Sequence, residues 1–411
     1  MRELLHTGRQ TYRGGDFSIV SNQSGGTSRN ATAPVRRRGL RFVGAVGATA
    51  LAVGLASGCG ASEDYTDYAV ELPDYYPADY SDIVTASKAE GGSLTIYSNT
   101  DQQSWAPIFK AFQAKFPWVG SINATNLDSD EVFQRVLSEQ ATGQASADVV
   151  VSNAADAWAD FAEREGTVAQ YTSPELSQLP EFAEALPSVY SMSVDPISLI
   201  YNTELLDESQ FPTSIEDLAT KVQADPDSFD GMIAVRNPKG AFGFTVTRAF
   251  VENDDAAWDE LADILPYSKN ETSTGSMVEK VTAGEYSVGF FMGAPALTAE
   301  QRTGGLIKAV FPSDGTPLLR RGISIADGAP HEATAKLFTD FVMSEDGQTA
   351  VAEGGLTAYR DGVEKPEDGV ATYSDVVDSV GEENTVLVPY IKATDEEIEQ
   401  FSDRWTSLQT G

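Results

Sequence analysis

Apolar runs and helically spaced apolar residues alternate along most of the chain, and one such unit shows the pattern clearly. Leu94, Ile96 and Tyr97 form a short apolar run that ends in the polar residues 98–101, as expected for a buried strand that feeds a loop. Apolar residues then recur at helical spacing through residues 105–116. The pattern predicts a polar loop at the carboxyl end of a strand, which is where open α/β sheets bind ligands.

Several more units of the same kind follow. Each predicted strand ends in a polar or glycine-containing loop, and a segment with helical spacing comes next. The further predicted strands are residues 147–151, 198–202, 232–235 and 288–292. Strands that alternate with helices imply parallel sheets and an α/β fold.

The charge of the chain restricts its partners. The 411 residues carry a formal net charge of −34, from 28 basic and 62 acidic residues. Such a surface repels nucleic acids and anionic lipids, so neither is expected as a partner. The length is sufficient for two domains.

Cysteine and histidine are scarce. The single cysteine, Cys59, excludes an intrachain disulfide and a thiolate metal cluster. The two histidines are His6 and His331, and His331 is predicted to be a surface residue at the start of a helix. A histidine-dependent hydrolase or a multi-histidine metal site would therefore depend on one residue, and no metal or cofactor is predicted.

The N-terminal residues resemble an export signal. Residues 36–41 are basic and residues 42–56 are uncharged and small or apolar, a stretch that is short for a membrane-spanning helix. It ends in L-A-S-G-C, which resembles the bacterial lipobox, so residues 1–58 are expected to be an extension with a lipoprotein signal, and Cys59 the lipidation site. Export by the twin-arginine route is an alternative. Residues 59–80, rich in Asp, Glu, Tyr and Pro, predict a tether, or alternatively an aromatic patch for a partner.

Ordered motifs between residues 81 and 407 resemble one known family. They are A-E-G-G-S-L-T-I-Y-S-N, A-D-V-V-V-S-N, S-L-I-Y-N-T, T-A-G-E-Y-S-V-G-F-F, F-P-S-D-G-T-P and A-K-L-F-T-D-F-V-M-S-E-D-G-Q. Together they are similar to the solute-binding proteins of ABC importers, in the ferric-ion-binding-like branch of the type 2 periplasmic binding fold. The resemblance implies an α/β protein with two lobes, mostly parallel sheets and two crossover hinge strands.

The resemblance also implies the domain boundaries. The crossovers are expected near residues 193–195 and 316–324. Lobe 1 is then discontinuous, with residues 81–193 and 320–411, and lobe 2 is residues 194–319. A monomer is expected, with a ligand held between the lobes.

The iron-binding positions of the branch are largely changed. Its ferric binders hold the ion with a histidine, a glutamate and a tyrosine pair, and by position these become Asp101, Asn153, Ala294 and Pro295. Alanine and proline offer no ligating side chain to a hard ion. Without the tyrosine pair, direct Fe(III) binding is disfavoured, and Fe(III) or an iron chelate is kept as an alternative ligand.

The anion-binding part of the family's site is retained. The loop that presents backbone N–H groups to an anion corresponds to Lys239, Gly240 and Ala241, at a predicted helix N-terminus with unpaired donors. Arg236 supplies a second cation. The other candidate ligand-binding residues are Ser98, Asn99, Asp101, Ser152, Asn153, Ser273, Thr274, Ser276 and Met292. Tyr97, Phe242, Phe291 and Met292 are expected to shape the pocket.

Each candidate has a simpler alternative. The serines, threonines and Asp101 are also suited to helix capping, and the two cations to a solvated surface. Asp101 alternatively contacts a cationic part of the ligand.

The sequence thus predicts a non-enzymatic, extracytoplasmic, lipid-anchored binding subunit of an ABC importer. Its ligand is predicted to be a small oxyanion-bearing solute, such as a phosphonate or an organic phosphate, which it delivers to the permease. An extracytoplasmic hydrolase that uses carboxylates, or a sensor on the same scaffold, is the alternative class.

Overall fold

A computed structural model of the protein describes residues 65–129, 131–144 and 147–410. The predicted signal segment and the predicted lipidation residue Cys59 lie outside these residues. Within the described part, no helix has the length and apolar character needed to cross a membrane. The described residues form one compact unit.

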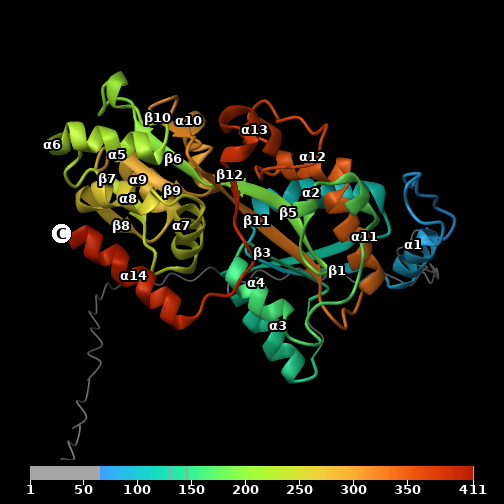
Figure 1. The fold of residues 1–411 in the computed structure, drawn as a ribbon. Helices are drawn as coiled ribbons and strands as arrows, with labels where there is room; N and C mark the ends of the chain where they lie inside the picture. The colour runs from blue at the N-terminus through green and yellow to red at the C-terminus, as the bar shows by residue number, and fades with distance from the viewer. Residues whose placement is uncertain (1–64, 130, 145–146, 411) are drawn as a thin grey trace, which may run out of the picture. The chain divides into compact units, whose positions relative to one another are not determined.

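Two β-sheets organise this unit (Figure 1). The larger sheet has the strand order β2-β1-β3-β11-β5-β4, and β12 pairs with β11. Its strands are β1 (Ser93–Ser98), β2 (Ser121–Asn126), β3 (Val149–Ser152), β4 (Glu184–Leu186), β5 (Val189–Pro196), β11 (Thr316–Ile325) and β12 (Thr385–Leu387).

The smaller sheet has the order β10-β6-β9-β7-β8. Its strands are β6 (Ser198–Asn202), β7 (Ile233–Arg236), β8 (Ser268–Glu271), β9 (Val288–Met292) and β10 (Ile307–Val310). The five strands predicted from apolar runs correspond to β1, β3, β6, β7 and β9. The strands β2 and β8 escaped prediction because their sequences, S-I-N-A-T-N and S-K-N-E, are largely polar, as edge strands often are.

The α/β class with two sheets and two crossovers is confirmed, whereas the expectation of mostly parallel strands is wrong. Among the described strand pairs, five are parallel and five antiparallel. The chain enters the smaller sheet along β5 and returns along β11, so these two strands pair antiparallel. The strand β6 follows β5 after a single residue, and it pairs antiparallel with both of its neighbours, β9 and β10.

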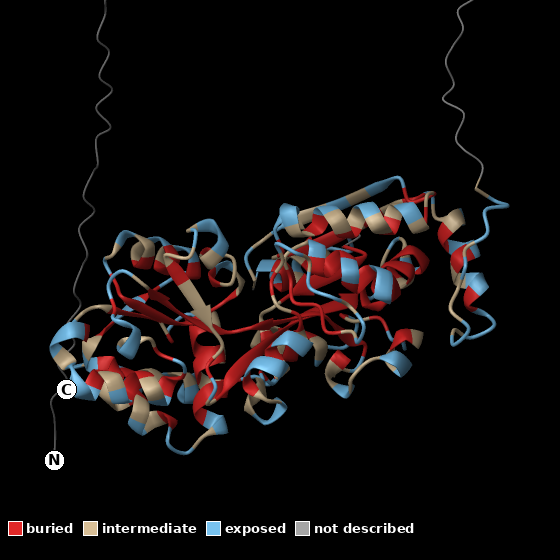
Figure 2. Ribbon diagram, turned by 90° about the horizontal axis from the view of Figure 1, so that it is seen from above, coloured by how far each residue is buried: buried red, intermediate tan, exposed pale blue. Residues whose placement is uncertain are grey.

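Helices cover both sheets, and the strands lie mainly in the buried interior (Figure 2). One apolar cluster includes Val150 of the larger sheet together with Leu199 and Phe290 of the smaller one, and a second includes Leu94, Trp105 and Phe338. The helices are α1 (Tyr80–Ala89), α2 (Gln102–Lys115), α3 (Glu131–Ala141), α4 (Ala155–Ala162), α5 (Ile215–Ala224), α6 (Pro226–Phe229), α7 (Ala241–Asn253), α8 (Ala257–Ile264), α9 (Thr274–Ala283), α10 (Ala299–Arg302), α11 (Glu332–Met343), α12 (Glu345–Glu353), α13 (Tyr373–Val380) and α14 (Asp395–Thr410).

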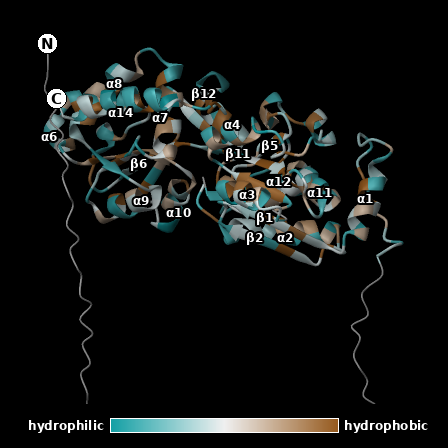
Figure 3. Cartoon of the chain, turned by 90° about the horizontal axis from the view of Figure 1, so that it is seen from below, coloured by the Kyte–Doolittle hydropathy of each residue, from teal (hydrophilic) through white to brown (hydrophobic). Residues whose placement is uncertain are grey.

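The C-terminal helix differs from the expected lobe assignment, which placed residues 320–411 with the larger sheet. Helix α14 packs against α8, and its Gln409 Nε2 donates to Ser268 Oγ at 3.1 Å and to Asn270 Oδ1 at 3.3 Å on β8. The helix is mainly hydrophilic (Figure 3), so its few apolar residues decide where it packs. Trp405, which is fully buried, is the largest of them.

His331 is also less exposed than predicted. It is half-buried before α11, and its Nδ1 lies 3.1 Å from Oδ2 of the buried Asp148.

The described part of the predicted tether packs on the larger sheet's side of the protein. Tyr75 and Tyr76 donate hydrogen bonds to the two carboxylate oxygens of Glu175, at 2.9 and 2.5 Å. Arg360 Nη1 lies 2.6 Å from the same carboxylate. The prediction of a tether is therefore wrong for residues 65–80. A tyrosine can bury its ring while its hydroxyl remains hydrogen-bonded. A segment rich in acidic residues and prolines can therefore still pack on the protein when it also carries tyrosines.

A second buried carboxylate anchors the end of this segment. The hydroxyls of Tyr80, Tyr171 and Ser173 all donate to Asp340 at 2.5 Å. Burial raises the pKa of the Asp340 carboxyl to about 7, and the three hydroxyls act in the opposite direction. Asp340 therefore binds a proton more readily in the folded protein than in the unfolded chain.

This proton predicts a pH-dependent stability. Between roughly pH 4 and 7 the folded state binds more protons at Asp340 than the unfolded state, so this contribution is complete at low pH and lost as the pH rises through about 7. In Asp340→Asn, the decrease in the free energy of unfolding from pH 5 to pH 8 should be smaller than in the wild type. Urea unfolding at both pH values measures it.

Comparing the wild type with Asp340→Asn isolates the contribution of Asp340. Burial also raises the pKa of Glu260 to about 7, but that group titrates in both proteins. Equal slopes for the two proteins would contradict the assignment.

Gly322 on β11 gives a second prediction. A Cβ at this position would lie 2.5 Å from Trp158 Nε1, which donates to the Ser152 carbonyl at 2.8 Å. Gly322→Ala should therefore displace a buried indole and cost about 1–3 kcal/mol of stability, measurable by thermal unfolding. Gly120→Ala is the matched control, because a Cβ there has no atom within 4 Å, and an equal loss in both variants would argue against the steric cause.

Candidate functional site

The loops that follow several strands line a cavity of about 460 Å³. Asn99 follows β1, Asn153 follows β3 and Gly293 follows β9, so loops from both sheets meet here as expected for an α/β protein. The cavity is lined by Asn99, Ser129, Asn153, Asp195, Ile197, Arg236, Phe242, Ser273, Thr274, Gly275, Gly293, Ala294, Pro295, Leu319 and Arg321.

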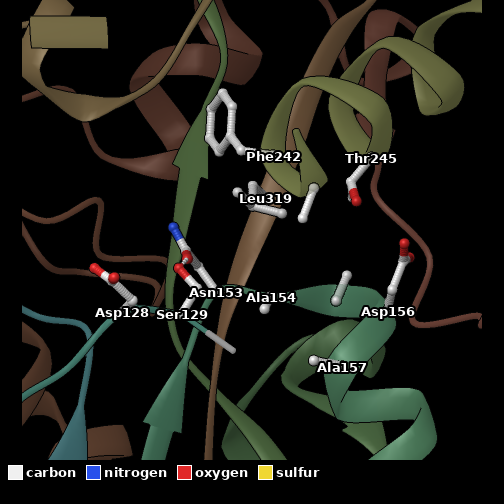
Figure 4. Close-up of a pocket in the computed structure, with 11 residues that line it drawn as sticks. Asp128, Ser129, Asn153, Ala154, Asp156, Ala157, Phe242, Thr245 and Leu319 are labelled. Carbon is white, nitrogen blue, oxygen red and sulfur yellow. Dashed lines mark hydrogen bonds between the residues drawn. The ribbon is translucent and has the colours of Figure 1, made fainter. Parts of the chain in front are cut away.

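A second pocket of about 310 Å³ shares four of these residues (Figure 4). It adds the carboxylates Asp128 and Asp156, the hydroxyl of Thr245, and several alanines. In the close-up, Asp156 of α4 and Thr245 of α7 point toward one another. Its shared lining residues are Ser129, Asn153, Phe242 and Leu319.

The wall that belongs to the larger sheet offers neutral polar groups. Asn99 Nδ2 donates to Ser129 Oγ at 2.8 Å and to Asn153 Oδ1 at 2.6 Å. Ser129 and Asn153 lie next to each other in Figure 4. The amides are held in place before a ligand binds, which lowers the entropy cost of using them.

Arg321 on β11 joins this wall to the crossover strands. Its Nη1 donates to Asn99 Oδ1 at 2.9 Å and to Thr100 Oγ1 at 3.1 Å, and its Nη2 lies 3.0 Å from Asp195 Oδ2 on β5. Ser193 Oγ donates to the other Asp195 oxygen at 3.0 Å. The ion pair is buried, so each charge depends on its partner.

The opposite wall carries a second arginine. The Arg236 guanidinium lies 4.7 Å from the centre of the Phe242 ring, and burial lowers its pKa from the ordinary value. No hydrogen bond or ion pair of its side chain is found within the described part of the chain. Its Nε is buried without a partner there. Arg236 is thus a cation whose donors are available to a ligand.

Helix α9 begins beside Arg236. Ser273 Oγ caps the helix by accepting from the Ser276 N–H at 3.1 Å, and Thr274 Oγ1 accepts from the Gly293 N–H at 3.2 Å. Both residues line the cavity, so the capping and ligand-facing roles are compatible at this position.

Six of the thirteen predicted ligand-binding residues line the two pockets. Five of them line the larger cavity, and Ala241 lines the smaller pocket only. The six are Asn99, Asn153, Arg236, Ala241, Ser273 and Thr274.

The other seven lie outside both linings. Lys239 and Gly240 are exposed, with Gly240 at the N-cap of α7. Ser98 and Ser152 are buried, and their hydroxyls accept from the N–H groups of Thr100 and Ala154. Asp101 is exposed, its side chain accepts a hydrogen bond from Asn126, and it does not cap α2. The Ser276 hydroxyl donates to Glu271, and Met292 is in the core.

Of the residues expected to shape the pocket, Phe242 lines both parts. Tyr97 bonds to Glu139, and Phe291 packs against Phe250 and Phe290, so neither lines the described pockets.

Sequence reasoning missed Asp195 and Arg321. A signal for Arg321 was present, since two adjacent arginines interrupt the apolar run T-P-L-L-R-R-G-I-S-I in an acidic chain. Because strand residues alternate between faces, only one of the two reaches the cavity, and Arg320 instead donates to the Val388 carbonyl at 3.2 Å.

The chain matches known proteins over most of its length. Residues 107–376 match the family described as bacterial extracellular solute-binding protein. An uncharacterized protein of Haemophilus influenzae is 28% identical over 278 residues, which are 64% of this chain and 77% of that protein.

Solved structures share the fold. The substrate-binding protein of an ABC transporter from Agrobacterium tumefaciens has a TM-score of 0.66 and 18% identity, over 78% of this chain and 96% of that one. The periplasmic binding protein AfuA of Actinobacillus pleuropneumoniae, with fructose-6-phosphate bound, has a TM-score of 0.55 and 21% identity, over 78% and 97%. Iron-bound HitA of Pseudomonas aeruginosa has a TM-score of 0.57 and 20% identity, over 77% and 98%.

These similarities agree with a cavity built from the loops of two sheets joined by crossover strands. The protein therefore belongs to the bacterial extracellular solute-binding proteins, a family whose members bind solutes outside the cytoplasm.

Proposed function

We propose that this protein captures a small solute with an oxyanion group, such as a phosphonate or an organic phosphate, and delivers it to a permease. The observation that carries the proposal is Arg236, a half-buried cation without an ion-pair partner among the described residues, on the wall of the cavity. Binding without chemical conversion of the solute is sufficient for this role.

The surroundings of Arg236 suit a phosphoryl or phosphonyl group. A guanidinium presents paired N–H donors that match two oxygens of such a group, and partial burial strengthens the contact. The adjacent N-terminus of α9 adds the hydroxyls of Ser273 and Thr274 and the positive end of the helix dipole.

The rest of the solute would meet neutral groups. Asn99, Ser129 and Asn153 offer amide and hydroxyl partners, and Phe242 and Leu319 offer apolar surface. AfuA, whose structure contains fructose-6-phosphate, shows that a related fold accommodates a phosphorylated solute.

Iron or an iron chelate is the second candidate, because iron-bound HitA shares the fold. Among the described lining residues, neither pocket has a tyrosine or histidine. A chelate such as ferric citrate would present carboxylates to Arg236, so it would use the same cation.

Arg236→Ala tests the anion site. Loss of a charge-assisted hydrogen bond costs about 1.5–3 kcal/mol, so the dissociation constant for the bound phosphonate or phosphate should rise roughly 10- to 100-fold. Isothermal titration calorimetry measures it, after a thermal-shift screen with phosphonates, sugar phosphates and inorganic phosphate. Lys239→Ala, an exposed cation outside both pockets, is the control and should bind as the wild type does.

The same screen decides between the candidates. A thermal shift with Fe(III)-citrate and none with any phosphonate or phosphate would reject the anion proposal in favour of iron.

We further propose that Cys59 carries a lipid that holds a monomer at the outer face of the cytoplasmic membrane. The support is the signal-like sequence before it, in residues that the structure does not describe. Cells that express the protein should incorporate labelled palmitate into it, and Cys59→Ser should abolish this. Labelling that persists in the variant would contradict the assignment.

A further inference from the structure

We infer that Asp195 restricts the ligand to a single negative charge, so that the cavity favours a monoanionic phosphoryl or phosphonyl group over a dianionic one. This inference rests on the proposed function and specifies the substrate class of the same site. It makes Asp195 a specificity-determining residue, although its side chain is already bonded within the protein.

Asp195 lies where the larger sheet meets the cavity. It lies near the end of β5, one residue before the chain leaves the larger sheet, and it lines the same cavity as Arg236 and Arg321. Its side chain is 5% exposed. A charge with so little solvent around it is poorly screened and acts on other charges in the cavity.

Asp195 neutralises one of the two arginines. Arg321 Nη2 lies 3.0 Å from Asp195 Oδ2, and Arg321 Nη1 is used by Asn99 and Thr100. Arg321 is therefore a donor group fixed in position, and its charge is balanced within the protein. Arg236 is left as the uncompensated cation among the described residues that line the larger cavity.

The described residues of the neighbouring pocket offer no further positive charge. Its described lining has two carboxylates, Asp128 and Asp156, and no lysine or arginine. Lys239, which the sequence placed beside the anion, is exposed and lines neither pocket. One negative charge on the ligand is thus balanced by Arg236, while a second would be desolvated without a matching cation, because Asp195 already neutralises Arg321.

The test uses two small probes at pH 8. Methyl phosphate is mainly a dianion there, because the second pKa of a phosphate monoester is about 6. Dimethyl phosphate has no second acidic proton and stays a monoanion. Calorimetry on the wild type should show tighter binding of dimethyl phosphate, and a preference for methyl phosphate would overturn the inference without involving any variant.

Asp195→Asn then removes the charge while an amide oxygen remains to accept from Arg321 or Ser193. Coulomb energy is proportional to ligand charge. The increase in the logarithm of the binding affinity from wild type to variant should therefore be about twice as large for the dianion as for the monoanion. If the variant binds dimethyl phosphate about 10-fold more tightly, it should bind methyl phosphate about 100-fold more tightly, so the ratio of the two affinities should shift about 10-fold toward methyl phosphate. An unchanged preference in a folded variant would show that Asp195 serves only to fix Arg321.

Two further variants complete the series. Arg321→Met removes a positive charge and should shift the preference further toward the monoanion, whereas Asp101→Asn, an exposed acid outside the cavity, should leave it unchanged. Circular dichroism verifies the folding of each variant.

If neither probe binds the wild type while Fe(III)-citrate does, the proposed function itself fails and this inference fails with it. Binding of both probes without discrimination rejects this inference alone.

Discussion

The buried ion pair between Arg321 and Asp195 connects the crossover strands to the candidate site. The two residues lie on β11 and β5, which pair antiparallel where the chain passes between the sheets. The same guanidinium bonds to Asn99 and Thr100, in the loop that follows β1. A buried charge without its partner is costly, so the pair requires these three segments to keep their arrangement. The positions of Asn99 and Asn153 in the cavity wall depend on that arrangement.

The electrostatics of the cavity follow from this pairing. Among the described residues that line the larger cavity are two arginines, and their roles differ because Arg321 is neutralised by Asp195 whereas Arg236 has no ion-pair partner within the described part of the chain. An overall charge of −34 gives no indication of such a site, since the local balance of a few poorly solvated groups determines which ligand is stabilised.

The N-terminal Tyr- and Pro-rich segment illustrates a second use of buried carboxylates. Glu175 and Asp340 accept hydrogen bonds from tyrosines that precede and begin α1, and they attach residues 65–80 to the body of the protein. Composition suggested a tether because acidic residues and prolines rarely form a core. The partners of these tyrosines lie about 100 and 260 residues away in the sequence, beyond the reach of any local pattern.

The sequence by itself determined the α/β class and the five strands with strong apolar runs, and it pointed to the loops after β1 and β3 as part of the candidate site. These follow from local periodicity, because a strand buried on both faces needs a continuous apolar run. The tertiary structure alone decided that Asp195 and Arg321 meet, that Lys239 faces solvent, and that α14 packs beside β8. Those outcomes depend on contacts between residues far apart in the chain, and on which face of a strand or loop each side chain occupies, neither of which periodicity specifies.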